Sequence, residues 1–122
     1  MRASLFTNEV HHAVNAISFL RQSMLQDLGN HTCAAIAECI GAPPLFLTRT
    51  LHNLAKNGII IAKKGAGGGF RVTQELLDTK TVLDVVTLLS LEKGIPLGGT
   101  AGGRLNLTVY DAINITLEDF LL

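Results

Sequence analysis

The residues best suited to chemistry gather in one short segment, "AKKGAGGGFRV" (62–72), where four glycines lie among two lysines and an arginine. A glycine-rich loop beside fixed positive charge is typical of a phosphate site, because the bare backbone approaches the anion closely and the cations neutralise it. The phosphate could belong to a nucleotide in an enzyme or to the backbone of a nucleic acid. The alternative without a ligand is a mobile hairpin tip.

The flanking residues argue against a nucleotide-binding enzyme. A phosphate loop of the dinucleotide or NTPase kind follows a strand and opens a helix, whose N-terminus supplies the amides and the dipole. Here "FRVT" follows the glycines and is β-like, and the spacing fits neither GxGxxG nor GxxxxGK[ST]. The chain also shows no Ser/His/Asp arrangement and no paired carboxylates at catalytic spacing. We therefore expect no enzyme, and a hairpin with a glycine-rich tip.

The charge distribution favours a nucleic acid. The chain has 10 basic and 10 acidic residues, so its formal net charge is zero. However, the stretch 41–74 contains no Asp or Glu and five basic residues, which are Arg49, Lys56, Lys63, Lys64 and Arg71. The last eighteen residues, 105–122, carry three acids and no Lys or Arg. One segment is thus predicted to attract anions.

Hydrophobic periodicity, together with residues typical of helix starts and ends, predicts helices before and within the basic segment 41–74. Apolar spacing predicts a helix over 8–22, a short helix from the N-cap Thr32 to about Ile40, and a third from about Pro44 to Asn57. The inward residues of the third helix would be Leu47, Leu51, Leu54 and Ala55. Residues 59–61 and 70–73 are predicted strands of the hairpin.

Two capping patterns mark the second half of the chain. Thr81 and Asp84 have the spacing of a capping box and predict a helix through about Leu91. "GIPLGGTAGG" (94–103) is a loop by composition, and Thr116 with Asp119 repeats the capping pattern.

Helix, glycine turn, helix and hairpin is the order of a winged helix-turn-helix, in which the second helix enters the major groove and the hairpin lies along the backbone. The predicted fold class is mainly α with a small β-hairpin wing (α+β), with a C-terminal dimerisation helix. The expected units are a DNA-binding domain over 1–92 and a loop with a dimerisation segment over 93–122.

The stretch "TCAAIAECIGAPPLFLTRTLHNLAKNGIIIAKKGAGGGFRVT" resembles the core of the Rrf2 (Rrf-two) family of bacterial transcription regulators (IscR-, NsrR- and CymR-like). The family pattern S-x-x-x-I-A is matched by Thr32 and 36–37, and Y-L-x-x-x-L-x-x-L by 46–47, Leu51 and Leu54. The wing pattern R-G-x-x-G-G-Y is matched over 64–70. The resemblance covers nearly the whole chain and implies a homodimer that binds double-stranded DNA at a palindromic operator, usually as a repressor.

By this resemblance the DNA contacts come from the recognition helix and the wing, namely Pro44, Leu45, Thr48, Arg49, His52, Lys63, Lys64, Gly65, Gly68, Gly69 and Arg71. Arg49 is the first candidate for a base contact, since bidentate Arg to guanine is the commonest direct reading; the alternative is a solvated surface charge. Thr48 could contact a phosphate or a base. Phe46 is expected to pack rather than to read DNA.

The cysteines depart from the family pattern. Cluster-binding members carry three cysteines in the loop after the post-wing helix, whereas residues 93–105 of this chain contain none. We therefore expect no iron–sulfur cluster and no other cofactor. Cys33 and Cys39 lie on one predicted helix, and each could be a thiol sensor or simply a tolerated small residue. The four histidines do not form a ligand set, so no metal site is expected.

The C-terminal apolar residues are expected to form the dimer interface, and the alternative is that they close the core of the monomer; they are Leu105, Val109, Ile113, Leu117, Phe120 and Leu121. No apolar run approaches the about 18 residues needed to span a membrane, and no signal peptide is apparent, so a cytoplasmic protein is expected. A second hypothesis for function is a winged-helix module that binds a protein partner and does not read DNA.

Overall fold

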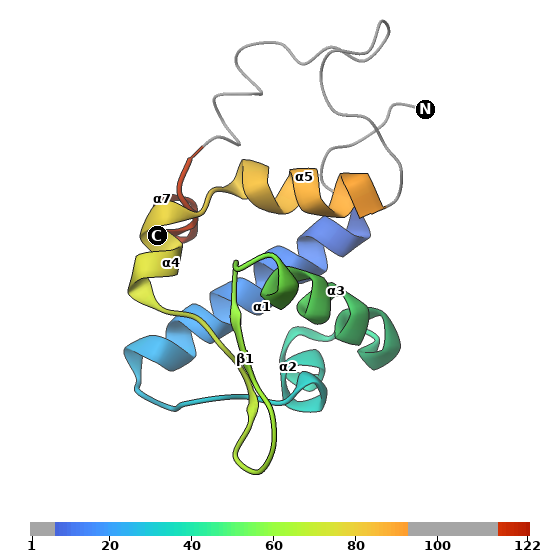
Figure 1. Ribbon diagram of the computed structural model, residues 1–122, viewed down its shortest axis with the longest axis vertical. Coiled ribbons are helices and arrows are strands. Elements are labelled where there is room, and N and C mark those ends of the chain that lie inside the picture. The colour runs from blue at the N-terminus through green and yellow to red at the C-terminus, as the bar shows by residue number, and fades with distance from the viewer. Residues whose placement is uncertain (1–6, 93–114) are drawn as a thin grey trace, which may run out of the picture.

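The computed structural model describes the backbone of residues 7–92 and 115–122 (Figure 1). The described elements are, in chain order, α1 (Asn8–Leu25), α2 (Cys33–Ile40), α3 (Pro44–Lys56), β1 (Ile61–Lys63), β2 (Gly69–Arg71), α4 (Gln74–Thr79), α5 (Val82–Glu92) and α7 (Leu117–Leu121). Helices dominate, and the two strands form one antiparallel hairpin. The predicted fold class is confirmed.

The core lies where α1 packs against α2, α3 and α5. Its largest fully buried side chains are aliphatic and come from every one of these helices, for example Ile17 of α1, Ile36 of α2, Leu51 of α3 and Leu89 of α5. Burial of this aliphatic surface is the main force that holds the helices together. Of the four residues predicted to face inward from α3, Leu47, Leu51 and Leu54 are fully buried and Ala55 is partly buried.

Threonine caps begin the helices where the sequence predicts them. The Thr32 hydroxyl accepts a hydrogen bond from the amide of Ala35, which satisfies one of the free donors of the first turn of α2. At the start of α5 the bonds are reciprocal: the Thr81 amide donates to Asp84 Oδ2 at 2.9 Å, and the Asp84 amide donates to Thr81 Oγ1 at 3.1 Å. The predicted capping box is therefore confirmed.

The end of α3 is also set by local sequence. Gly58 adopts a φ of 77°, in the left-handed region, and its amide donates to the carbonyl of Ala55. The amide of Ile59 reaches back to the carbonyl of Leu54 at 2.9 Å, which completes a Schellman motif. This turn reverses the chain after α3 and leads it toward the hairpin.

Three boundaries differ from the predictions. α1 continues to Leu25 instead of ending near residue 22. Strand β1 starts at Ile61, because Ile59 and Ile60 are buried in the core beside the end of α3 before the hairpin begins. Strand β2 ends at Arg71, because Thr73 caps a helix that the sequence did not reveal, α4, by accepting a hydrogen bond from the Leu76 amide.

The last helix folds back onto the chain's own core. Leu117 is fully buried, and its amide donates to the carbonyl of Lys80 at 2.8 Å. Leu121 packs against the same core. For these two residues, closing the monomer's core is the correct alternative, whereas Phe120 remains 38% exposed. Leu105, Val109 and Ile113 lie outside the described residues.

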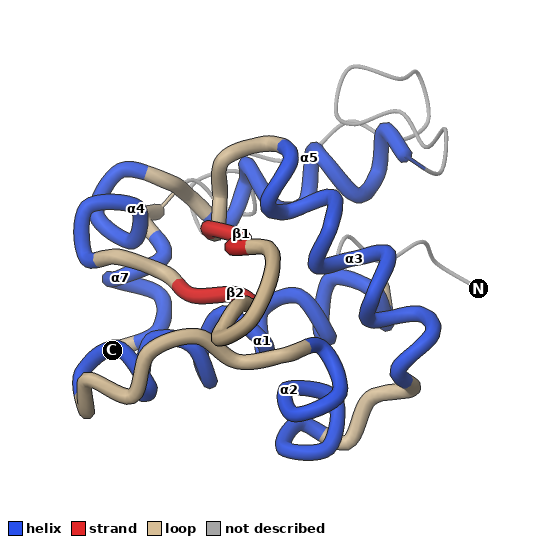
Figure 2. Tube along the Cα trace, turned by 60° about the horizontal axis from the view of Figure 1, so that its bottom comes forward, coloured by secondary structure: helices blue, strands red, loops and turns tan. Residues whose placement is uncertain are grey.

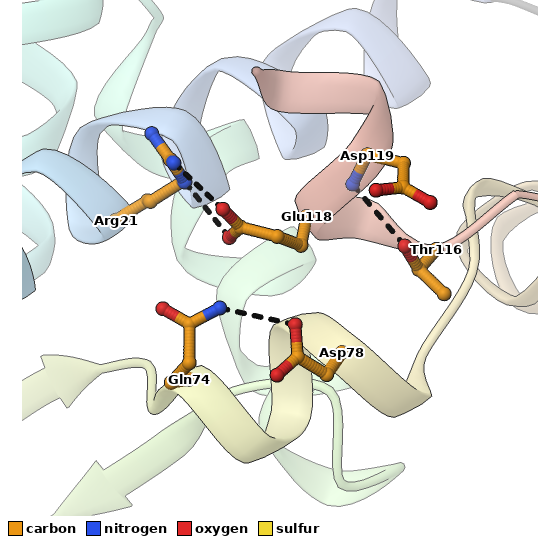
Figure 3. A network of polar contacts seen from close by, with 6 residues as sticks. All are labelled: Arg21, Gln74, Asp78, Thr116, Glu118 and Asp119. Carbon is orange, nitrogen blue, oxygen red and sulfur yellow. Dashed lines mark hydrogen bonds and ion pairs between the residues drawn. The ribbon is translucent and has the colours of Figure 1, made fainter.

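A paired carboxylate and guanidinium lock α7 to α1 (Figure 3). Arg21 donates from Nε and Nη2 to the two carboxylate oxygens of Glu118, at 3.0 and 2.7 Å. The hydrogen bonds from Arg21, followed by that from Gln74, lower the pKa of the Glu118 carboxyl below its ordinary value of 4.5. The same pairing raises the pKa of Arg21. This bidentate pair gives the short α7 a fixed position.

Among the described residues, no helix is both long and apolar enough to cross a membrane.

Candidate nucleic-acid interface

The candidate interface begins at the turn between α2 and α3. Gly41 ends α2 with a φ of 73°, and Pro44 occupies the first turn of α3, where its missing N–H costs nothing. The Thr48 hydroxyl donates to the carbonyl of Pro44 at 2.9 Å and lies 3.0 Å from Cys33 Sγ. These contacts fix the first turn of α3 against the N-terminus of α2.

One face of α3 is exposed along its whole length. At about 100° per residue, the buried Leu47, Thr50, Leu51 and Leu54 point to one side of this helix. The opposite side carries a stripe of exposed residues at i, i+4, i+7 and i+11, which are Leu45, Arg49, His52 and Lys56. Thr48 flanks the stripe and is also exposed. The structure thus brings together the residues predicted to face the major groove.

The first turn of this helix is apolar as well as exposed. Leu45 is 87% exposed and Phe46 is 70% exposed. Phe46 was expected to pack rather than to read DNA, but its exposure contradicts packing: it lies near the edge of the exposed face, whereas the next residue, Leu47, is fully buried.

The wing, residues 61–71, is a tight hairpin that projects from the helices (Figure 1), and its strands β1 and β2 lie side by side (Figure 2). Its register pairs Ile61 with Arg71 and Lys63 with Gly69. At the tip the Gly68 amide donates to the carbonyl of Gly65 at 3.0 Å, which closes the turn. A Cβ on Gly68 would overlap the carbonyl oxygen of Lys63, so glycine is required there by the hairpin itself.

A third segment of backbone holds the wing in place. In the linker between α1 and α2, the His31 amide donates to the Phe70 carbonyl at 3.0 Å, and the Phe70 amide donates to the His31 carbonyl at 2.7 Å. A Cβ on Gly69 would overlap that His31 carbonyl. The Asn30 side chain adds a hydrogen bond to the carbonyl of Gly67 at 3.1 Å. The sequence prediction missed this bridge, although a glycine next to a strand aromatic is a signal of close backbone approach.

The wing contacts α3 directly. The imidazole of His52 meets the ring of Phe70 edge-on, with 5.7 Å between ring centroids and an interplanar angle of 88°. His52 belongs to the exposed stripe of α3, whereas Phe70 is buried on the inner face of the wing. This contact sets the distance between the helix and the hairpin.

The basic residues of the wing do not all lie at its tip. Lys63 and Lys64 are exposed and stand at the tip end of β1. Arg71 shares a face of the hairpin with Lys63 but lies at the opposite end of the strands. There it lines a small cavity of about 120 Å³ together with Met24 and Asp27 near the end of α1. Its position favours contact at the edge of the interface.

The cysteines do not form a shared site. Cys33 is partly buried against α3, rather than on a fully exposed turn, and Cys39 is exposed. In residues 7–92 and 115–122, no group of three or more His, Cys, Asp or Glu side chains could hold a metal ion. No cysteine occurs elsewhere in the sequence.

These features define a winged helix-turn-helix protein of the DNA-binding class. A family model described as Rrf2, iron-dependent transcriptional regulator, matches residues 6–105. The chain therefore belongs to the Rrf2 family, whose members are transcriptional regulators and not enzymes.

One protein is similar to this chain in sequence, and two solved structures are similar to it in fold. A protein of Aquifex aeolicus (strain VF5), named as an HTH-type transcriptional regulator, is 29% identical over 87 residues; the match covers 69% of this chain and 56% of that protein. The structure of IscR from T. potens is 21% identical, with a TM-score of 0.69 and coverage of 99% and 86%. The structure of CymR (YrzC), described as the global cysteine regulator of B. subtilis, is 17% identical, with a TM-score of 0.74 and coverage of 99% and 97%. Both structures share the fold of this chain.

The family description names iron, so the residues of this chain that could serve as ligands need to be identified. Residues 93–114 contain neither cysteine nor histidine. The Cys33 thiol is engaged with Thr48, and Cys39 stands at the other end of α2.

Proposed function

We propose that this chain is a sequence-specific DNA-binding regulator that acts as a homodimer on a palindromic operator and represses transcription. The observation that carries the proposal is the surface formed by the exposed face of α3 and the basic wing. This surface contains Arg49, Lys56, Lys63 and Lys64, and no Asp or Glu occurs anywhere from 41 to 74. A surface of this charge matches the phosphates of duplex DNA.

In the proposed complex α3 lies in the major groove and the wing lies along the backbone. Arg49 reads a base, since guanidinium pairs with guanine in bidentate fashion. Lys63 and Lys64 contact phosphates, and Gly65 at the turn lets the backbone of the tip approach the duplex. Pro44, Leu45, Thr48, His52, Gly68, Gly69 and Arg71 complete the proposed contact set.

We further propose that the regulator works without an iron–sulfur cluster, because the loop 93–105 lacks the cysteines that cluster-binding relatives use there. Visible charge-transfer absorbance in the protein purified without oxygen would contradict this.

Selection from a random pool of duplex DNA at near-physiological salt tests the proposal. We expect enrichment of an imperfect palindrome, with half-sites separated by roughly one helical turn, and an affinity that falls steeply with salt. Retention without a motif, at low salt only, would refute sequence-specific binding.

The second candidate function is a module that binds a protein partner, and the exposed Leu45 and Phe46 favour it. Exposed apolar side chains at a helix tip are common in protein interfaces. The same selection separates the two functions, because a protein-binding module enriches no sequence.

A further inference from the structure

Leu45 and Phe46 form the most exposed pair of large apolar side chains among the described residues. The other strongly exposed ones lie singly at a helix end, in a loop or at the C-terminal residue, for example Leu25, Leu28 and Leu122. Adjacent exposed apolar side chains at a helix start indicate a contact surface. We call this pair the apolar tip of α3.

The apolar tip is held rigidly. Pro44 fixes the backbone immediately before it, and the Thr48 hydroxyl bonds to the carbonyl of Pro44 one turn later. The Cys33 thiol, 3.0 Å from that hydroxyl, ties the same turn to α2. The next residue, Leu47, is fully buried and prevents the helix from rolling Phe46 inward. A contact made by this tip would lose little conformational entropy.

The surroundings of the tip identify its occupant. Arg49 follows Leu45 by one helical turn on the same exposed stripe, and Lys56 ends that stripe. No carboxylate occurs in the sequence from 41 to 74. The occupant must therefore be anionic overall and apolar at one point. The major groove of DNA meets both conditions, because its only apolar group on a base edge is the 5-methyl group of thymine.

We infer that Leu45 and Phe46 recognise thymine by contact with its 5-methyl group, at a base position next to the one read by Arg49. The inference rests on the proposed function and adds a specificity that a basic surface alone does not give. Phosphate contacts position the protein, whereas the apolar tip selects a base.

Replacement of single thymines by deoxyuridine in the selected operator tests the inference, since this removes the methyl group and leaves every hydrogen-bonding group of the base in place. Burial of one methyl contributes about 0.8 kcal/mol, which corresponds to about fourfold in affinity. We expect deoxyuridine at one or two positions per half-site to weaken binding of the full chain by about fourfold. Fluorescence anisotropy at fixed salt measures it.

Two variants complete the test. In Phe46→Ala the ratio of affinities for the thymine-containing and deoxyuridine-containing duplexes should fall to about one. In Leu45→Ala this ratio should fall to a lesser extent. Lys64→Ala is the matched control, which should bind both duplexes more weakly and leave the ratio unchanged. Circular dichroism should show unchanged folding, because all three side chains are exposed.

The outcomes separate the inference from the proposed function. Tight operator binding with equal affinity for thymine and deoxyuridine at every position would overturn the inference alone. A ratio that persists in both Phe46→Ala and Leu45→Ala would also overturn it, as would a loss of self-association in Phe46→Ala by sedimentation of the DNA-free protein. Failure to enrich any operator would overturn the proposed function and the inference with it.

Discussion

Replacement of Gly69 by alanine should loosen the wing far more than replacement of Gly67, although both glycines have positive φ. Gly67 has a φ of 73°, and a Cβ there would meet no atom within 4 Å. Gly69 has a φ of 134°, and a Cβ there would overlap the backbone carbonyl of His31. The pair therefore separates conformational strain from close approach.

The magnitudes follow from the geometry. For Gly67→Ala, left-handed strain of about 1–2 kcal/mol is partly offset by about 0.4–1 kcal/mol from the stiffer unfolded chain. For Gly69→Ala, strain in a region that side chains rarely adopt costs about 1–3 kcal/mol. Relief of the overlap also breaks the two hydrogen bonds between His31 and Phe70, at about 1 kcal/mol each. With the same offset from the unfolded chain applied to both, the net expectation is about 2–5 kcal/mol for Gly69→Ala and about 0–2 kcal/mol for Gly67→Ala.

Urea denaturation at one fixed protein concentration measures the difference. With an m-value of about 2 kcal/mol/M, the midpoint of Gly69→Ala should fall by about 1–2.5 M. Amide exchange should show lost protection at His31 and Phe70 in this variant only. Equal destabilisation by the two substitutions would refute the role of the linker bridge.

Three further predictions concern the C-terminal helix and the interface. Leu117→Ala should lower the free energy of unfolding by about 2–5 kcal/mol, because it leaves a cavity at a fully buried site. The control Leu122→Ala, at an exposed residue, should change the free energy of unfolding by less than about 0.5 kcal/mol. Similar urea midpoints for the two variants would contradict the packing of α7 on the core. Because the pKa of Glu118 is lowered in the folded state, its pairing with Arg21 stabilises the fold above pH 4.5, and this stabilisation is lost as the pH falls through the folded-state pKa. Glu118→Gln should therefore flatten the pH dependence of the free energy of unfolding below about pH 5. An unchanged dependence of stability on acid pH in this variant would contradict the role of the pair. Arg49→Ala should cost about 1–3 kcal/mol of operator affinity and relax preference at one base position, whereas Lys64→Ala should weaken all sequences alike; equal losses for Arg49→Ala on operator and random DNA would exclude base reading.

Much of the fold could be predicted from the sequence because the residues that begin and end its helices act through local contacts. Thr32, Gly41 and Gly58 begin or end helices through hydrogen bonds within a few residues of themselves. Local signals of this kind survive whatever the tertiary structure is. The helices of the turn and the hairpin were therefore predicted in the right order.

The missed features depend on contacts between distant residues. The backbone bridge between His31 and Phe70 joins residues that are 39 positions apart in the sequence, and no periodic sequence pattern marks it. The six-residue α4 is too short to show helical periodicity. Phe46 was predicted to pack, but the buried face of α3 is taken by Leu47, Leu51 and Leu54, and Phe46 lies outside that face.

The glycines of the wing and its lysines have separate roles. Gly68 and Gly69 are required by carbonyls of the chain itself, those of Lys63 and His31. Glycine richness in this hairpin is thus explained by the fold without any ligand. A phosphate ligand is indicated instead by Lys63 and Lys64, whose side chains are exposed and have no acidic residue nearby in the sequence. Substitution of the lysines should therefore reduce DNA affinity and leave stability unchanged. Substitution of Gly69 should reduce stability first, and DNA affinity only as a consequence.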